Sequence, residues 1–206
     1  SPARLLESVI RFEAVHDING WDDLRRRLDP PDRRCYAFFH PAMPDALLIF
    51  VEVALTRGLA DNIQQILRND RTPLAPAQAD TAIFYSINNC QQGLRGMPFG
   101  HFLIKQVTTD LQNELPNLTR FATLSPIPGF SAWRERRPGG GGPDGTDRQL
   151  LMAQAADYLT MAKNSGGLPL DPVARFHLGN GARLERLNWM ADSSPKGLRE
   201  SAGLMV

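Results

Sequence analysis

The alternation of apolar and polar positions predicts strands and helices that succeed one another along the whole chain. Period-two alternation or continuous apolar runs predict strands at 8–16, 33–40, 46–56, 81–87 and 120–124. Apolar positions at helical spacing predict helices at 21–28, from Gly58 onward, through Ile104 to Leu115, at 149–163 and in a last amphipathic segment ending near Met190. This mixture indicates an α/β or α+β domain.

Proline and glycine mark the connections between these elements. A five-residue loop at 41–45 predicts a hairpin between the second and third strands, which gives the sheet an antiparallel start. Arginines and a glycine run at 139–142 predict that 134–148 forms a flexible surface loop inside the domain. We therefore expect one domain across residues 1–206.

Composition excludes several classes of function. The 23 Lys and Arg against 22 Asp and Glu leave a net charge of +1, which favours neither nucleic acid nor an acidic membrane surface as a partner. The longest apolar run, 46–55, is about half the length of a membrane-spanning helix and contains Glu52. Cys35 and Cys90 form no disulfide framework or zinc motif, which favours a reduced, cytoplasmic location.

A glycine-bearing loop between the strand at 81–87 and the next helix is a candidate phosphate site. Glycines let backbone N–H groups approach a phosphate, and a helix N-terminus adds positive charge. The loop is neither a Walker A motif nor a dinucleotide fingerprint, and an ordinary glycine turn explains it equally well. Its candidate binding residues are Gln91, Gln92, Gly93, Leu94, Arg95, Gly96 and Gly100.

Three other side chains are candidates for chemistry, each with a simpler structural explanation. Ser86 ends a strand, where a serine commonly serves a turn, and it lacks the flanking glycines of a hydrolase nucleophile. His177 precedes the Gly179-Asn180-Gly181 turn and is either a proton carrier or a structural histidine. Glu52 interrupts an apolar strand, so it either has buried partners or points outward from a sheet edge.

At these residues the sequence resembles malonyl-CoA decarboxylases, over most of its length. The resemblance implies an acetyltransferase (GNAT)-like mixed sheet flanked by helices, and conversion of malonyl-CoA to acetyl-CoA and CO2 without metal or other cofactor. It also implies that both ends belong to a longer protein, whose N-terminal helical domain serves homo-oligomerisation. The segments that carry the resemblance include Cys35-Tyr36-Ala37-Phe38-Phe39-His40-Pro41, Val51-Glu52-Val53-Ala54-Leu55-Thr56, Phe84-Tyr85-Ser86-Ile87, Phe176-His177-Leu178 and Asn188-Trp189-Met190-Ala191-Asp192.

The resemblance assigns the family's serine and histidine pair to Ser86 and His177, with Glu52 nearby. It implies that Ser86 binds the malonyl group, that His177 protonates the thioester enolate, and that the glycine-bearing loop holds the CoA pyrophosphate. Two other functions remain open at this point. The same fold and loop would serve an acyl-CoA-dependent acetyltransferase, or a module that binds acyl-CoA without catalysis.

Overall fold

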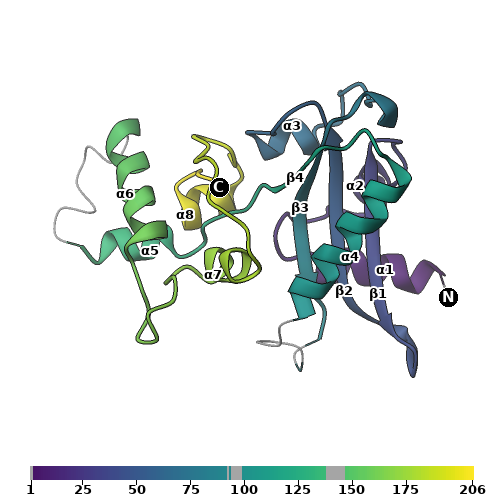
Figure 1. Cartoon of the computed structure of the whole chain (residues 1–206), viewed down its shortest axis with the longest axis horizontal. Coiled ribbons are helices and arrows are strands. Elements are labelled where there is room, and N and C mark those ends of the chain that lie inside the picture. The colour runs from purple at the N-terminus through teal and green to yellow at the C-terminus, as the bar shows by residue number, and fades with distance from the viewer. Residues whose placement is uncertain (1, 92, 94–98, 138–146) are drawn as a thin grey trace. The chain divides into compact units, whose positions relative to one another are not determined.

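The computed structural model describes residues 2–91, 93, 99–137 and 147–206. These residues form two compact units (Figure 1). Unit 1 contains Ser1–Ala60 and Gln65–Thr123, and unit 2 contains Asp61–Gln64 and Leu124–Val206. Each unit has a hydrophobic core of its own, so each is described separately.

Unit 1 is built on a mixed sheet of four described strands in the order β1-β2-β3-β4. Strands β1 (Arg33–His40), β2 (Met43–Thr56) and β3 (Thr81–Asn89) are antiparallel neighbours, and β4 (Arg120–Thr123) runs parallel to β3. The predicted mixed sheet with an antiparallel start is confirmed. The hairpin differs from the expected five-residue loop, because both strands continue until only Pro41 and Ala42 connect them.

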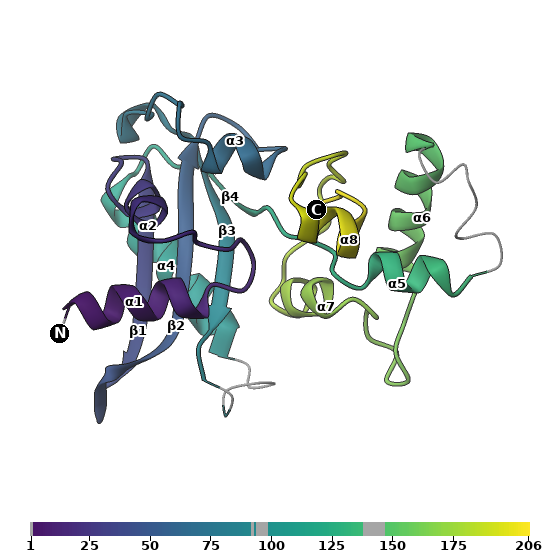
Figure 2. The same ribbon diagram turned by 180° about the vertical axis from the view of Figure 1, so that it is seen from behind.

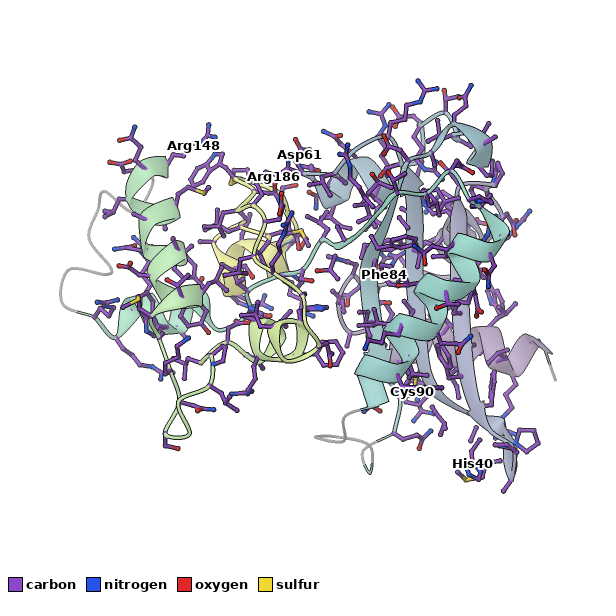
Figure 3. The ribbon with its side chains drawn as sticks, in the orientation of Figure 1. His40, Asp61, Phe84, Cys90, Arg148 and Arg186 are labelled. Carbon is purple, nitrogen blue, oxygen red and sulfur yellow. The ribbon has the colours of Figure 1, made fainter. Side chains whose placement is uncertain are left out.

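Helices cover both faces of this sheet. Helix α4 (Phe99–Glu114) packs on one face, and α1 (Pro2–Phe12) and α2 (Trp21–Leu28) pack on the other (Figures 1 and 2). Phe84 lies in the α4 layer (Figure 3). Buried apolar residues in that layer include Val51, Val53, Leu55, Phe84, Val107 and Leu111, and those in the opposite layer include Val9, Leu24, Leu47 and Phe50.

The strand predicted at 8–16 is wrong, because residues up to Phe12 belong to helix α1 and an irregular segment follows. Apolar and polar residues alternate over part of this stretch, but Leu5 and Val9, like Leu6 and Ile10, are four residues apart. That spacing gives a helix one apolar side, and this side packs against the sheet. The helical signal therefore lay partly upstream of the alternating segment.

A short helix, α3 (Ile63–Leu67), and a 3-10 turn, Pro76–Gln78, lie between β2 and β3. The helix expected from Gly58 onward is thus shorter and begins later than its apolar spacing indicates. The predicted strand at 120–124 and helix at 21–28 agree closely with β4 and α2. Among the described residues, no helix combines the length and apolar character that crossing a membrane requires.

Unit 2 is helical around a small core. Its helices are α5 (Phe130–Glu135), α6 (Arg148–Thr160), α7 (Pro172–Gly179) and α8 (Pro195–Ser201). Helix α6 was predicted, whereas the segment between Gly181 and Met190 contains no helix. The loop predicted at 134–148 begins inside α5, and its residues 138–146 lie outside the described residues. The core of the unit contains Ile127, Phe130, Leu151, Ala155, Tyr158, Leu159, Ala174 and Leu204.

Candidate functional site

Ser86 owes its orientation to a bulge in β3. Ser86 pairs with Glu52, but the next residue of β2, Val53, pairs with Phe84, so Tyr85 is an extra residue in the ladder. Phe84 belongs to the core under α4. Because the bulge inserts a residue, Ser86 and Glu52 both face the α1 and α2 side of the sheet. Two of the three predicted catalytic residues are therefore brought together.

The hydroxyl of Ser86 lies in a buried hydrogen-bond network. Its Oγ donates to Oε2 of Glu13 at 2.7 Å and accepts from Nδ2 of Asn88 at 2.6 Å. Asn88 Nδ2 also donates to the same Glu13 oxygen at 2.7 Å. Three polar side chains, all buried, therefore saturate one another at this position.

Glu13 is held where the chain leaves helix α1. Its Oε1 accepts from the backbone N–H groups of Val15 at 2.7 Å and His16 at 2.9 Å. Asn88 fixes the same turn, because its Oδ1 accepts from the N–H of Ala14 at 2.9 Å. The turn after α1 and the end of β3 are thus tied together through polar side chains.

Glu52 is fully buried beside this network. Its Oε2 lies 3.5 Å from Nη1 of Arg27, and within the described ranges Oε1 has no hydrogen-bond partner. The pKa of Glu52 is raised to about 8, mainly by burial and secondly by the charge of Glu13, against the opposing effect of Arg27. The carboxyl group is therefore largely protonated at neutral pH.

Arg27 reaches Glu52 from helix α2 and is itself anchored by the backbone. It donates to the carbonyl oxygens of His16 and Asp17, each at 2.8 Å, and lies 3.4 Å from Asp23 of its own helix. Tyr85, the extra residue of the bulge, is buried on the same side, and burial raises the pKa of its hydroxyl well above the ordinary value. A buried polar layer thus lies between the sheet and helices α1 and α2.

His177 belongs to unit 2 and is positioned by helix α7. The carboxylate of Asp171 caps the helix by accepting from the N–H groups of Val173 and Ala174 at 2.9 and 2.8 Å. Nε2 of His177 lies 3.2 Å from Oγ of Ser125. Burial lowers the pKa of His177 to about 4, so its imidazole is neutral at pH 7. The pairing of His177 with Ser86 stays a prediction, because the two residues belong to different units.

The predicted phosphate loop is described only in part. Gln92, Leu94, Arg95 and Gly96 lie outside the described residues, and Gly100 is the second residue of α4. The side chain of Gln91 donates to the carbonyl of Leu47 at 2.9 Å, which anchors the start of the loop on β2. Gly93 is exposed, and a side chain there would meet nothing within 4 Å. Phosphate binding by this loop stays a prediction.

Four residues that contact the predicted catalytic side chains directly or through this network were not predicted from the sequence: Glu13, Arg27, Asn88 and Ser125. Glu13 was placed in a strand that does not exist, and Asn88 and Ser125 were treated as loop residues. The only sequence signal for Glu13 and Asn88 is their polarity beside apolar runs. In the part of the chain that the structure describes, no cluster of three or more His, Cys, Asp or Glu side chains is arranged to hold a metal ion.

Comparison with known proteins places these features in a family. The model of the malonyl-CoA decarboxylase C-terminal domain matches residues 1–139 and 144–206. The mitochondrial malonyl-CoA decarboxylase of Anser anser anser is 38% identical over 252 residues, and that of Rattus norvegicus is 37% identical over 255. These alignments cover 100% of this chain and 49% and 51% of the relatives. The chain thus spans about half the length of the curated relatives it matches.

Solved structures of malonyl-CoA decarboxylases are also similar to this chain. Malonyl-CoA decarboxylase from Rhodopseudomonas palustris is 50% identical, with a TM-score of 0.90, and covers 100% of this chain and 56% of its own. The enzyme from Agrobacterium vitis is 48% identical, with a TM-score of 0.89 and coverages of 100% and 57%. The GNAT-like decarboxylase GphF in complex with isobutyryl-CoA has a TM-score of 0.65 at 20% identity, and it covers 100% of this chain and 93% of its own. This distant likeness confirms the GNAT-like fold.

Proposed function

The chain belongs to the malonyl-CoA decarboxylase family, and on that premise we propose that it carries out the decarboxylation of malonyl-CoA to acetyl-CoA and CO2. The observation that carries the proposal is the buried hydroxyl of Ser86, held by Glu13 and Asn88 on the face of the sheet that also bears Glu52. Polar groups that are already ordered in a buried layer can stabilise the charge that develops on a substrate during a reaction.

The proposed reaction breaks the bond between the carboxylate carbon and the α-carbon of the malonyl group. The electron pair of that bond passes into the thioester carbonyl as CO2 leaves, which produces a thioester enolate. One proton then reaches the α-carbon and completes acetyl-CoA. The protein must therefore bind a carboxylate, stabilise an oxyanion and deliver a proton. Each hydrogen-bond donor aimed at the oxyanion contributes about 3 kcal/mol.

We assign the carboxylate-binding role to Ser86 and the proton delivery to His177. The neutral resting imidazole of His177 fits this role, because an anionic substrate beside it raises its pKa and lets it take up the proton that it later gives to carbon. Glu52, protonated at neutral pH, shapes the buried layer under Ser86 without adding a full negative charge. The loop from Gln91 to Gly100 is the proposed pyrophosphate site.

We further propose that the reaction uses no metal or prosthetic group, since a thioester carbonyl is itself able to accept the electron pair. Dialysis against a strong chelator should leave turnover unchanged. The proposed partners are malonyl-CoA and further copies of the same protein, with no nucleic acid or membrane, in the cytoplasm. Light scattering of the complete protein tests the self-association, and cell fractionation tests the compartment.

The direct test is to incubate the protein with malonyl-CoA and to follow acetyl-CoA and CO2 together. We expect both to appear in equal amounts, and His177→Ala to lower turnover by about 10² to 10⁴-fold while CoA affinity is retained. Release of free CoA with an acylated amine would instead identify an acetyltransferase. Binding of malonyl-CoA without any turnover in the parent protein would identify a non-catalytic module.

A further inference from the structure

Ser86 has one hydroxyl proton, and in this structure Ser86 donates it in a hydrogen bond to Glu13. Both oxygens of the Glu13 carboxyl group accept hydrogen bonds from N–H groups, Oε1 from the backbone and Oε2 from Asn88. Ser86 is therefore the donor in its 2.7 Å contact with Oε2. Asn88 Nδ2 uses its two hydrogens to donate to Glu13 and to Ser86, so the Ser86 oxygen already accepts one hydrogen bond. Ser86 therefore presents a lone pair, and no hydrogen, to an incoming ligand.

The direction of this network is fixed from outside. The side-chain amide of Asn88 cannot exchange the positions of its oxygen and nitrogen without losing a hydrogen bond, because its Oδ1 accepts from the N–H of Ala14. The other oxygen of Glu13 is occupied by the N–H groups of Val15 and His16. All three polar side chains are more than nine-tenths buried, so water does not readily replace any of these bonds. The resting arrangement is thus well defined.

We propose that Glu13 is a positioning residue that disfavours the carboxylate of the bound substrate and thereby promotes its loss as CO2. This inference rests on the proposed decarboxylation. A substrate carboxylate that accepts a hydrogen bond from Ser86 must replace Glu13 as the acceptor of that hydrogen bond. Two hydrogen-bond lengths then separate the two carboxylates, about 5 Å in all. Like charges at that distance weaken binding by roughly one hundredfold at the effective dielectric constant of a partly buried pair.

The penalty ends with the chemical step. When the C–C bond breaks, CO2 leaves as a neutral molecule and the electron pair moves to the enolate, away from the departing carboxylate. The hydroxyl of Ser86 then returns to Glu13, and no atom or electron is exchanged between them. Binding energy from the CoA moiety offsets the penalty in the bound substrate, as it does in enzymes that use remote contacts to destabilise a reacting group.

Two non-reactive ligands isolate this effect from turnover. The carboxyethyl thioether of CoA carries the carboxylate and lacks the carbonyl that decarboxylation needs, and the propyl thioether has the same length without charge. Calorimetry on the 206-residue chain gives the ratio of their dissociation constants. We expect the parent protein to bind the propyl compound more tightly. We expect Glu13→Gln to bind the carboxyethyl compound at least about tenfold more tightly than the parent, with less than twofold change for the propyl compound.

Matched variants separate charge from structure. Glu13→Asp keeps the charge and should keep the parent's preference for the propyl compound. Glu114→Gln removes the same charge from an exposed site on α4 and should leave the ratio unchanged. With malonyl-CoA, Glu13→Gln should lower both kcat and KM, whereas general damage to the fold lowers kcat and weakens both thioethers equally.

Several results would overturn the inference. One is a parent protein that binds the carboxyethyl compound more tightly than the propyl compound, a measurement that needs no variant to fold. Another is a Glu13→Gln variant with the parent's thermal transition and an unchanged ratio. Failure of the proposed function is a separate result: it shows as an absence of acetyl-CoA from malonyl-CoA, whatever the ratio of the two thioethers.

Discussion

Nε2 of His177 lies 3.2 Å from the hydroxyl of Ser125, a residue whose own backbone is fixed by two hydrogen bonds of 2.8 Å to Val206. The contact gives the imidazole a polar partner outside its own helix. A hydroxyl suits a histidine whose pKa is strongly lowered. It can donate to a neutral imidazole or accept from it, and it adds no charge that would favour the protonated ring.

His177 should make the protein less stable in acid. Burial lowers its pKa from 6.5 to about 4 in the folded state, so the unfolded chain binds more protons between these values. Stability therefore falls as the pH drops through this window, by at most roughly 3 kcal/mol from this group. Urea unfolding from pH 7 to pH 4 should show a steeper loss in the parent than in His177→Gln. Parallel curves would contradict the lowered pKa.

Glu52 should give a dependence of the opposite sign at higher pH. Its pKa is raised from 4.5 to about 8, so the folded state holds more protons than the unfolded chain across that window. Stability should decline as the pH rises from 5 to 9, because the buried carboxyl loses its proton. Melting temperatures of Glu52→Gln should decline less. The exposed substitution Glu114→Gln serves as the control and should follow the parent.

Gly129 should not tolerate a side chain. A Cβ at this position would overlap the hydroxyl oxygen of Tyr158, which donates to Asp171 at 3.2 Å. Gly129→Ala should cost about 2 to 3 kcal/mol, because it forces Tyr158 off the carboxylate that caps α7. Gly179→Ala, at a position with nothing within 4 Å, is the matched control. Equal midpoints of chemical unfolding for the two variants would refute this account.

The two cysteines should react slowly in the native protein. Burial is the main reason that the pKa values of Cys35 and Cys90 both rise to about 12, so very little thiolate exists near neutral pH. We expect iodoacetamide at pH 7.5 to modify them roughly a thousandfold more slowly than a free cysteine. Unfolding in urea should restore ordinary rates for both. Rapid labelling of either residue without urea would show that its surroundings open readily.

The sequence predicted the elements whose signal is local. Helix α2 and strand β1 were placed to the residue, because a proline pair follows one and a continuous β-rich run defines the other. The strand predicted at 8–16 failed because two periodicities compete there, and contact with the sheet decides between them. Helices α5 and α8 are each shorter than two turns and were missed.

The candidate site was predictable only through resemblance. Ser86, Glu52 and His177 have no local pattern that separates them from structural residues. Glu13 was beyond reach for a physical reason: its contacts to Ser86 and Asn88 join positions 73 and 75 residues apart. A hydrogen bond across that separation exists only after the sheet has formed and α1 has docked on it.

The bulge at Tyr85 changes which face of the sheet the following side chains of β3 occupy. Strand side chains alternate between the two faces, so if Tyr85 were an ordinary paired residue of the ladder, Ser86 would point the same way as Phe84, toward the apolar layer under α4. Asn88 would turn with it, and the hydroxyl and the amide would both lose their carboxylate. The bulge therefore sets which face of the sheet carries the polar side chains. Deleting Tyr85 would keep Ser86 and Phe84 on opposite faces, because the two would then be neighbours in a regular ladder.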